Sequence, residues 1–197
     1  MKKILTILII IIGFIYTKNL VSVVKNYDDI MIKIKEEKDK YYIKPIEAII
    51  ENNTIIPGIK GKEVDINKTY SKMKRYGKYE ESLIVLKDIE VKNHIDKNRY
   101  IISGNKNKNM VTLIFDKKVD NKYCYLEERI KCNNKYKIIP NIIIKDNYYT
   151  ELKKNLKSGS IISIYTSQQL KKELPIMIKY IHLKGYKIVN LDKLLEE

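Results

Sequence analysis

The chain has 197 residues, of which 44% are hydrophobic, and its formal net charge is +15 at pH 7. It contains only 7 Gly and 4 Pro, so its composition excludes a largely disordered protein and allows one ordinary domain or two small ones. The charge suits a polyanion partner, but Lys, Ile and Asn also belong to A/T-rich codons, so charge alone does not indicate nucleic acid.

The N-terminus has the pattern of a secretory signal that is not removed. Lys2 and Lys3 precede an apolar run from Ile4 to Tyr16, and no small-x-small cleavage site follows. As a helix this run covers only ~20 Å, so crossing a ~30 Å hydrocarbon core requires the helix to continue to Val24. We therefore expect residues 1–24 to be a signal-anchor of a single-pass cell-membrane protein whose C-terminal part is extracytoplasmic. A buried strand or core helix is the alternative.

Two short regions are expected next. Residues 25–40 place charged residues around spaced isoleucines, which predicts a juxtamembrane helical stalk. Residues 41–103 read as a small α+β module with short strands on either side of one helix. That helix is expected to begin after Asp65 or Asn67 and to end at Gly77.

Residues 110–197 alternate strands and helices after a polar loop. A helix capped by Asp146 is followed by a buried strand, and then by a helix whose apolar stripe runs from Leu170 to Ile181 and stops at Gly185. Such strand–helix–strand units require parallel pairing with a right-handed crossover. We expect an α/β fold with a short, mostly parallel open sheet of about five strands and flanking helices.

The two cysteines give little information about compartment. Cys124 and Cys132 have no second pair with which to form a zinc site. A disulfide between them is possible if the compartment is oxidising, but spacing alone does not establish that their Cα atoms lie within bonding reach. We expect them to be small core residues.

Four segments resemble one known family in their order along the chain. They are TIIPGIKGKEVDINKTYSKMKRYG (54–77), MVTLIFD (110–116), YCYLEERIKCNNKYKIIPNIIIKD (123–146) and GSIISIYTSQQLKKELPIMIKYIHLKGYKIVNLDKLL (159–195). They resemble membrane-anchored polysaccharide deacetylases of the NodB-homology type from Gram-positive bacteria. The second segment looks like their opening strand, which ordinarily ends in Thr-Phe-Asp-Asp-Gly, and the fourth looks like their closing strand–helix–strand.

The resemblance implies a metal site that this sequence does not complete. In the family the first Asp of the opening motif is a general base, and the second Asp and a His-x-x-x-His pair hold a divalent metal. Asp116 takes the base position, whereas Lys117 and Lys118 replace the second Asp and the Gly. His94 and His182 are the only two histidines and stand far apart in the sequence, so the pair is absent.

Two further departures concern the barrel. In the family, a late histidine in the closing strand helps the catalytic acid, and Tyr165 takes its position in this sequence. Between Val119 and Tyr123 the chain passes almost directly from the first strand to a late one, where the family carries several barrel strands and the metal site. The resemblance therefore implies the remnant of a NodB-type barrel, truncated internally and without a metal or other cofactor.

These departures decide what we expect of Asp116. A metal ion makes a nucleophile by lowering the pKa of bound water from ~15.7 toward ~7. One carboxylate beside the positively charged Lys117 does not bind such an ion. We expect Asp116 to be a vestigial strand-end acid; the alternatives are a residue that grips an acetyl or hydroxyl group, or a working base. His94 is expected in a loop and His182 on a helix surface.

Three functions remain open. The first is a degenerate deacetylase-like envelope protein, catalytically inactive, that contacts cell-wall glycan or an anionic wall polymer. The second is a residual metal-dependent carbohydrate N-acetyl deacetylase, and the third is a non-functional gene remnant. Nucleic-acid binding has only bulk charge in its favour, because no reader motif occurs.

Overall fold

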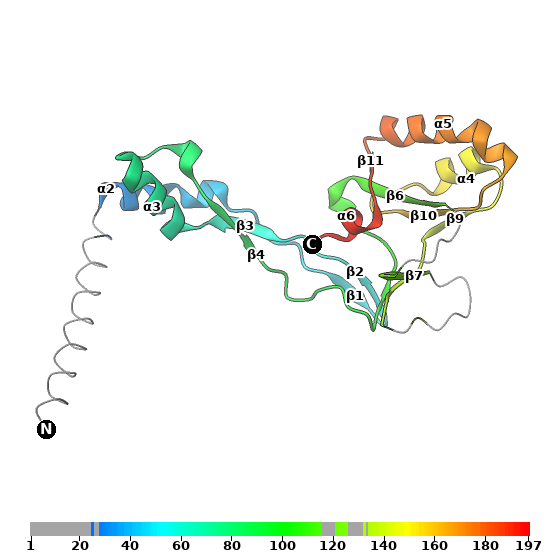
Figure 1. The fold of residues 1–197 in the computed structure, drawn as a ribbon, viewed down its shortest axis with the longest axis horizontal. Helices are drawn as coiled ribbons and strands as arrows, with labels where there is room; N and C mark the ends of the chain where they lie inside the picture. Colours follow the sequence, from blue (N-terminus) through cyan, green and yellow to red (C-terminus); the bar gives the residue numbers. More distant parts are fainter. Residues whose placement is uncertain (1–24, 26–27, 116–120, 126–131, 133) are drawn as a thin grey trace, which may run out of the picture. The chain divides into compact units, whose positions relative to one another are not determined.

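The computed structural model describes residues 25, 28–115, 121–125, 132 and 134–197 (Figure 1). They fall into two compact units. The first unit comprises the chain up to Lys44 together with Gly61–Ile89, and the second comprises Pro45–Lys60 together with Glu90–Glu197. No helix among the described residues has the length and apolar character needed to cross a membrane. The predicted signal-anchor lies outside the described residues.

The first unit packs two helices with a hairpin. Its elements are α2 (Asp29–Glu37), η1 (Lys38–Tyr41), β3 (Gly61–Val64), α3 (Ile66–Tyr76), η2 (Glu81–Leu83) and β4 (Leu86–Ile89), with β3 and β4 antiparallel. Ile34 of α2, Val64 of β3 and Met73 of α3 form its buried core. The segment expected to be a stalk therefore belongs to this unit, because α2 buries its apolar face there.

The caps of α3 match the sequence pattern. The Asp65 carboxylate accepts a hydrogen bond from the Lys68 N–H at 3.0 Å, so Asp65 rather than Asn67 caps the helix. Gly77 ends it with φ 89°, a left-handed conformation that favours glycine.

The second unit contains two sheets. The five-stranded sheet has the order β1-β2-β5-β8-β7, and its strands are β1 (Ile49–Glu51), β2 (Thr54–Ile56), β5 (Tyr100–Ile101), β7 (Tyr123–Tyr125) and β8 (Tyr136–Ile138). The four-stranded sheet has the order β11-β6-β10-β9, and its strands are β6 (Met110–Phe115), β9 (Ile142–Ile144), β10 (Ile161–Ile164) and β11 (Lys187–Ile188). All strand pairs are parallel except the β1–β2 hairpin.

This topology differs from the single short sheet expected from the sequence. Parallel pairing is confirmed, but the strands at 49–56 and 100–101 join the second unit instead of the module predicted at 41–103. The physical reason is pairing over long sequence distances, since β2 pairs with β5 and β5 pairs with β8. No local pattern in so short a strand specifies its partner.

Helices cover the four-stranded sheet on one side (Figure 1). The remaining elements are η3 (Lys106–Lys108), α4 (Tyr148–Asn155), α5 (Gln168–Leu183) and α6 (Leu191–Leu195). Ile162 and Ile164 of β10 share a core with Leu152 of α4 and Met177 of α5, while Ile161 shares a second core with the five-stranded sheet and α6. Side chains alternate along a strand, so β10 serves both cores, and all four of its residues are buried.

The prediction that Asp146 caps α4 was wrong. Asn147 is the N-cap, with φ 47°, and its side chain makes no capping hydrogen bond. The Glu173 carboxylate of α5 accepts a hydrogen bond from the Tyr149 N–H at 2.8 Å instead. A tertiary contact thus replaces the local cap.

The structure joins the two cysteines in a disulfide. Their Cα atoms lie 5.7 Å apart, within the usual range for such a bond. The expectation of two small core residues is therefore corrected, although Cys124 is also buried, with 7% of its surface exposed.

A buried backbone contact joins the loop before β6 to the turn before β10. The Gly104 N–H donates to the Gly159 carbonyl oxygen at 2.8 Å, and the Gly159 N–H donates to the Met110 carbonyl oxygen at 2.7 Å. Gly159 has φ 84°, and a Cβ added there would lie 2.3 Å from the Gly104 carbonyl oxygen. Only glycine fits at this position.

We predict that Gly159→Ala lowers the free energy of unfolding by roughly 2–4 kcal/mol, about 1 from the positive φ and the rest from overpacking. Gly185→Ala is the matched control, because Gly185 has φ 78° but a Cβ added there would meet no atom within 4 Å. It is expected to lose only about 1 kcal/mol. Urea unfolding of the full-length variants measures both values, and equal losses would contradict the steric explanation.

Candidate functional site at the carboxyl edge of the four-stranded sheet

The carboxyl ends of β6, β10 and β9 lie side by side. Ile164 is in register with Phe115 on one side and with Ile144 on the other. Ligands of α/β proteins commonly bind at such an edge, because the loops that leave the strands gather there. Asp116, which follows Phe115 in the sequence, lies outside the described residues.

A tyrosine and a lysine stand at this edge. The Tyr165 N–H donates to the Ile144 carbonyl oxygen at 3.0 Å, which extends the pairing of β10 with β9 by one residue. The Lys145 Nζ lies 5.4 Å from the centre of the Tyr165 ring, a cation–π distance. Tyr165 is the position where the resemblance implies a histidine, so the described edge carries a phenol ring beneath an ammonium group.

Tyr148 holds the turn after β10 in place. Its side chain is fully buried, and its hydroxyl donates to the Tyr165 carbonyl oxygen at 2.7 Å and lies 2.9 Å from the Ser167 Oγ. Ser167 in turn caps α5 by accepting from the Gln169 and Leu170 N–H groups. No sequence pattern indicates this role of Tyr148, because its contacts exist only when β9 and β10 are neighbours.

The two histidines lie on separate surfaces of the second unit. His94 is exposed in an irregular segment and contacts the Glu197 carboxylate, which also accepts from the Ile95 N–H at 2.8 Å. His182 is exposed on α5. Both placements confirm the sequence expectation. Neither histidine is part of a cluster, since no three His, Cys, Asp or Glu side chains gather to hold a metal ion among the described residues.

The donor set at the described edge does not fit a divalent metal. A lysine ammonium has no lone pair and repels a second cation, and a phenol ring paired with it offers no ligand of the usual kind. The Tyr148 hydroxyl is committed to the Tyr165 carbonyl oxygen.

Comparison with known proteins gives one sequence match and three structural matches. The structure of wild-type BA3943 from Bacillus anthracis, a CE4 family pseudoenzyme, matches with a TM-score of 0.52 and 15% identity over 86% of this chain and 96% of that one. The chain has a CE4-type fold. Two BA3943 mutants match equally at 15% identity, one with a TM-score of 0.52 and one described as having restored enzymatic activity with 0.51.

The matching sequence is an uncharacterized protein, YlxY, from Bacillus subtilis strain 168. It is 27% identical over 134 residues, which is 66% of this chain and 41% of that protein. The chain therefore spans about two fifths of the length of the curated relative it matches. No family model matches the sequence.

We predict that Tyr148→Phe lowers the free energy of unfolding by roughly 1–2 kcal/mol, because the Tyr165 carbonyl oxygen and the Ser167 hydroxyl lose a buried partner. Tyr149→Phe is the neighbouring control. Tyr149 packs edge-on against the Tyr180 ring at 5.6 Å, a contact that phenylalanine keeps, so a change within about 0.5 kcal/mol is expected. Thermal or urea unfolding compares the two variants. An unchanged free energy of unfolding for Tyr148→Phe would contradict the role of the hydroxyl.

Proposed function

We propose that this protein is a catalytically inactive, deacetylase-like envelope protein that is held at the cell membrane by its N-terminal segment and contacts cell-wall glycan or an anionic wall polymer. The observation that most supports this proposal is the Lys145–Tyr165 pair at the carboxyl edge of a CE4-type sheet. An ammonium group stands there, at the edge where a deacetylase of this fold would need a cation-binding site.

The sequence around this edge supports loss of catalysis. Lys117 replaces the second motif Asp, and the two histidines of the chain are separated in the fold. Hydrolysis of an N-acetyl group needs an activated water, and these residues provide neither metal ligands nor a second base for it. Asp116 is then a vestige of the motif.

The short connection after β6 supports a reduced barrel. β6 ends at Phe115 and β7 begins at Tyr123, so seven residues stand where the resemblance implies several strands. The present two-sheet arrangement is in this proposal the remnant of a NodB-type barrel.

The disulfide supports an extracytoplasmic location. Bonds such as Cys124–Cys132 persist in oxidising compartments and are rare where glutathione keeps thiols reduced. A signal-anchor in residues 1–24 would deliver the rest of the chain to such a compartment.

The first test is metal binding and acetate release. We expect the full-length protein to take up no stoichiometric zinc or cobalt and to release no acetate from chitooligosaccharide or peptidoglycan. Lys117→Asp, which restores the second carboxylate of the motif, is expected to remain inactive because no histidine pair accompanies it. The BA3943 mutant with restored activity is the positive control for the acetate assay. Stoichiometric metal uptake with acetate release by the unaltered chain would instead establish the residual deacetylase.

The second test is binding to wall material. We expect the full-length protein to be retained on purified cell wall, and Lys145→Glu to weaken retention severalfold while Lys153→Glu, a change on the exposed side of α4, does not. Retention that persists at about 1 M salt indicates a shaped glycan site, because charge alone is screened there. Absence of retention at low salt would favour the gene-remnant alternative.

A further inference from the structure

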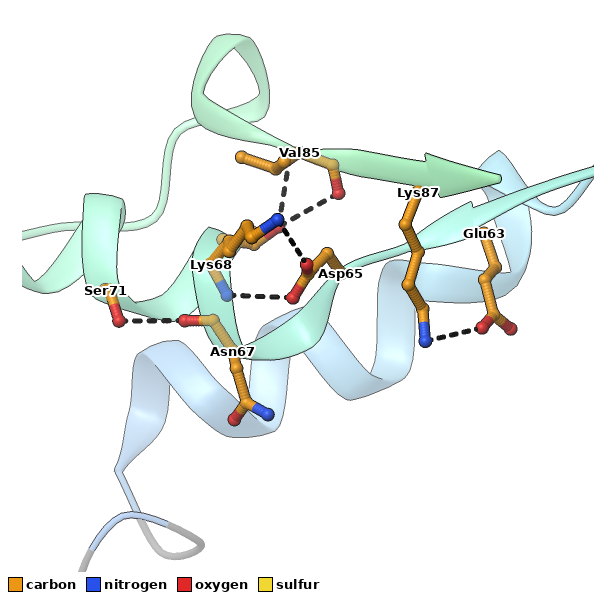
Figure 2. Close-up of polar contacts among 8 residues, drawn as sticks. Glu63, Asp65, Asn67, Lys68, Ser71, Val85 and Lys87 are labelled. Atoms are coloured by element: carbon orange, nitrogen blue, oxygen red, sulfur yellow. Dashed lines mark hydrogen bonds and ion pairs between the residues drawn. The ribbon is translucent and has the colours of Figure 1, made fainter. Parts of the chain in front are cut away.

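A groove beside α3 in the first unit is lined mainly by cationic and polar side chains. Its volume is about 450 Å³, and the side chains that line it are Asn67, Lys68, Ser71, Lys72, Arg75 and Val85. Lys68, Lys72 and Arg75 stand at positions i, i+4 and i+7 and therefore lie along one side of the helix. Figure 2 shows Asn67, Lys68 and Ser71 on the first turns of α3, together with Val85, the residue before β4.

Two cations elsewhere on this unit are paired with carboxylates, whereas two of the three in the groove are not so paired among the described residues. Lys74 pairs with Asp28 at 2.5 Å, and this hydrogen bond raises the pKa of Lys74. Lys87 pairs with Glu63 at 2.8 Å. Within the described part of the chain, neither Lys72 nor Arg75 has a carboxylate partner.

One carboxylate borders the groove. Asp65 lies 3.5 Å from the Lys68 Nζ, but its carboxylate is already used to cap α3. The hydrogen bond from the Lys68 N–H, first among several causes, lowers the pKa of Asp65, so it stays ionised. Lys72 and Arg75, further along the helix, leave an excess of positive charge in the groove.

The groove lies next to the residue that follows the predicted membrane span. The Lys25 Nζ donates to the Asn67 Oδ1 at 2.7 Å and lies 5.0 Å from the centre of the Tyr70 ring. Lys25 is the first residue after the predicted anchor at 1–24. With the predicted span ending at Val24, Lys25 and the Asn67 end of the groove stand at the level of the headgroup layer, which is roughly 5–8 Å deep on each side of the hydrocarbon core.

The chemistry of the groove suits a phosphodiester. The Arg75 guanidinium offers paired N–H donors to phosphate oxygens, and Lys72 offers a point charge. The Ser71 hydroxyl donates to the Asn67 main-chain carbonyl oxygen at 2.8 Å, so towards a glycerol hydroxyl it acts as an acceptor, and the Asn67 side-chain NH₂ acts as a donor. The lysine stems with Val85 give an apolar floor.

We propose that the groove formed by Lys68, Lys72 and Arg75 on α3 binds the headgroups of anionic phospholipids and so seats the first unit on the membrane surface. This inference rests on the proposed membrane anchor. It adds an electrostatic attachment, worth about 1 kcal/mol per Lys or Arg near an anionic surface, to the hydrophobic one, and so holds the first unit against the headgroups.

The test uses the full-length protein in vesicles of phosphatidylcholine, with or without phosphatidylglycerol. Amine acetylation followed by mass spectrometry measures the reactivity of each lysine. We expect phosphatidylglycerol to slow the modification of Lys68 and Lys72 by roughly fivefold, the factor that corresponds to about 1 kcal/mol per cation near an anionic surface. Lys153 on α4 is the internal control and is expected to be unaffected.

Two variants separate the groove from general charge. Lys72→Glu with Arg75→Glu is expected to abolish the protection of Lys68, whereas Lys153→Glu with Lys154→Glu keeps it. Added salt at about 0.5 M is expected to remove the protection, because exposed charges are screened at that ionic strength.

The outcomes distinguish this inference from the proposed function. Flotation of the vesicles in a density gradient reports membrane attachment. If the chain floats with both vesicle types but its lysines are equally reactive in each, the lipid site is overturned and the anchor stays intact. If the chain floats with neither vesicle type, both proposals are overturned. Protection of Lys68 and Lys72 by soluble poly(glycerol phosphate) but not by phosphatidylglycerol vesicles also overturns the lipid assignment and identifies a wall polymer as the ligand.

Discussion

The burial of β10 on both faces is the constraint on which the second unit depends. Ile162 and Ile164 pack under α4 and α5, and Ile161 packs toward the five-stranded sheet. A strand that is apolar on both sides is stable only between two layers, and β10 is flanked by β6 and β9 in parallel register. This central position fixes where the strands end and where the carboxyl edge lies.

The same constraint separates the fold from its chemistry. The apolar residues of β10 hold the carboxyl edge together whichever side chains follow the strands, so those side chains are free to change. Here the turn after β10 is held by the hydroxyl of Tyr148, and Lys145 rests over the Tyr165 ring. Among the described residues, the packing of this CE4-type sheet rests on apolar side chains and backbone pairing, and its edge carries the Lys145 ammonium.

Elements with local signals could be predicted from the sequence, and elements that depend on distant partners could not. Asp65, Gly77 and Gly185 mark helix ends by their own backbone preferences and were placed correctly. The strands at 49–56 and 100–101 were assigned to the wrong unit because two or three residues do not encode a partner far along the chain. Asp146 failed as a cap because a tertiary carboxylate, Glu173, takes that role. At the candidate site, the two histidines were placed correctly, but Tyr148 was missed, since its contact exists only across neighbouring strands.

The two units are interleaved along the chain. The backbone passes from one to the other after Lys44, after Lys60 and after Ile89. Neither unit is therefore encoded by one uninterrupted stretch of the gene. A single crossover between genes therefore cannot deliver or delete one unit without severing the other.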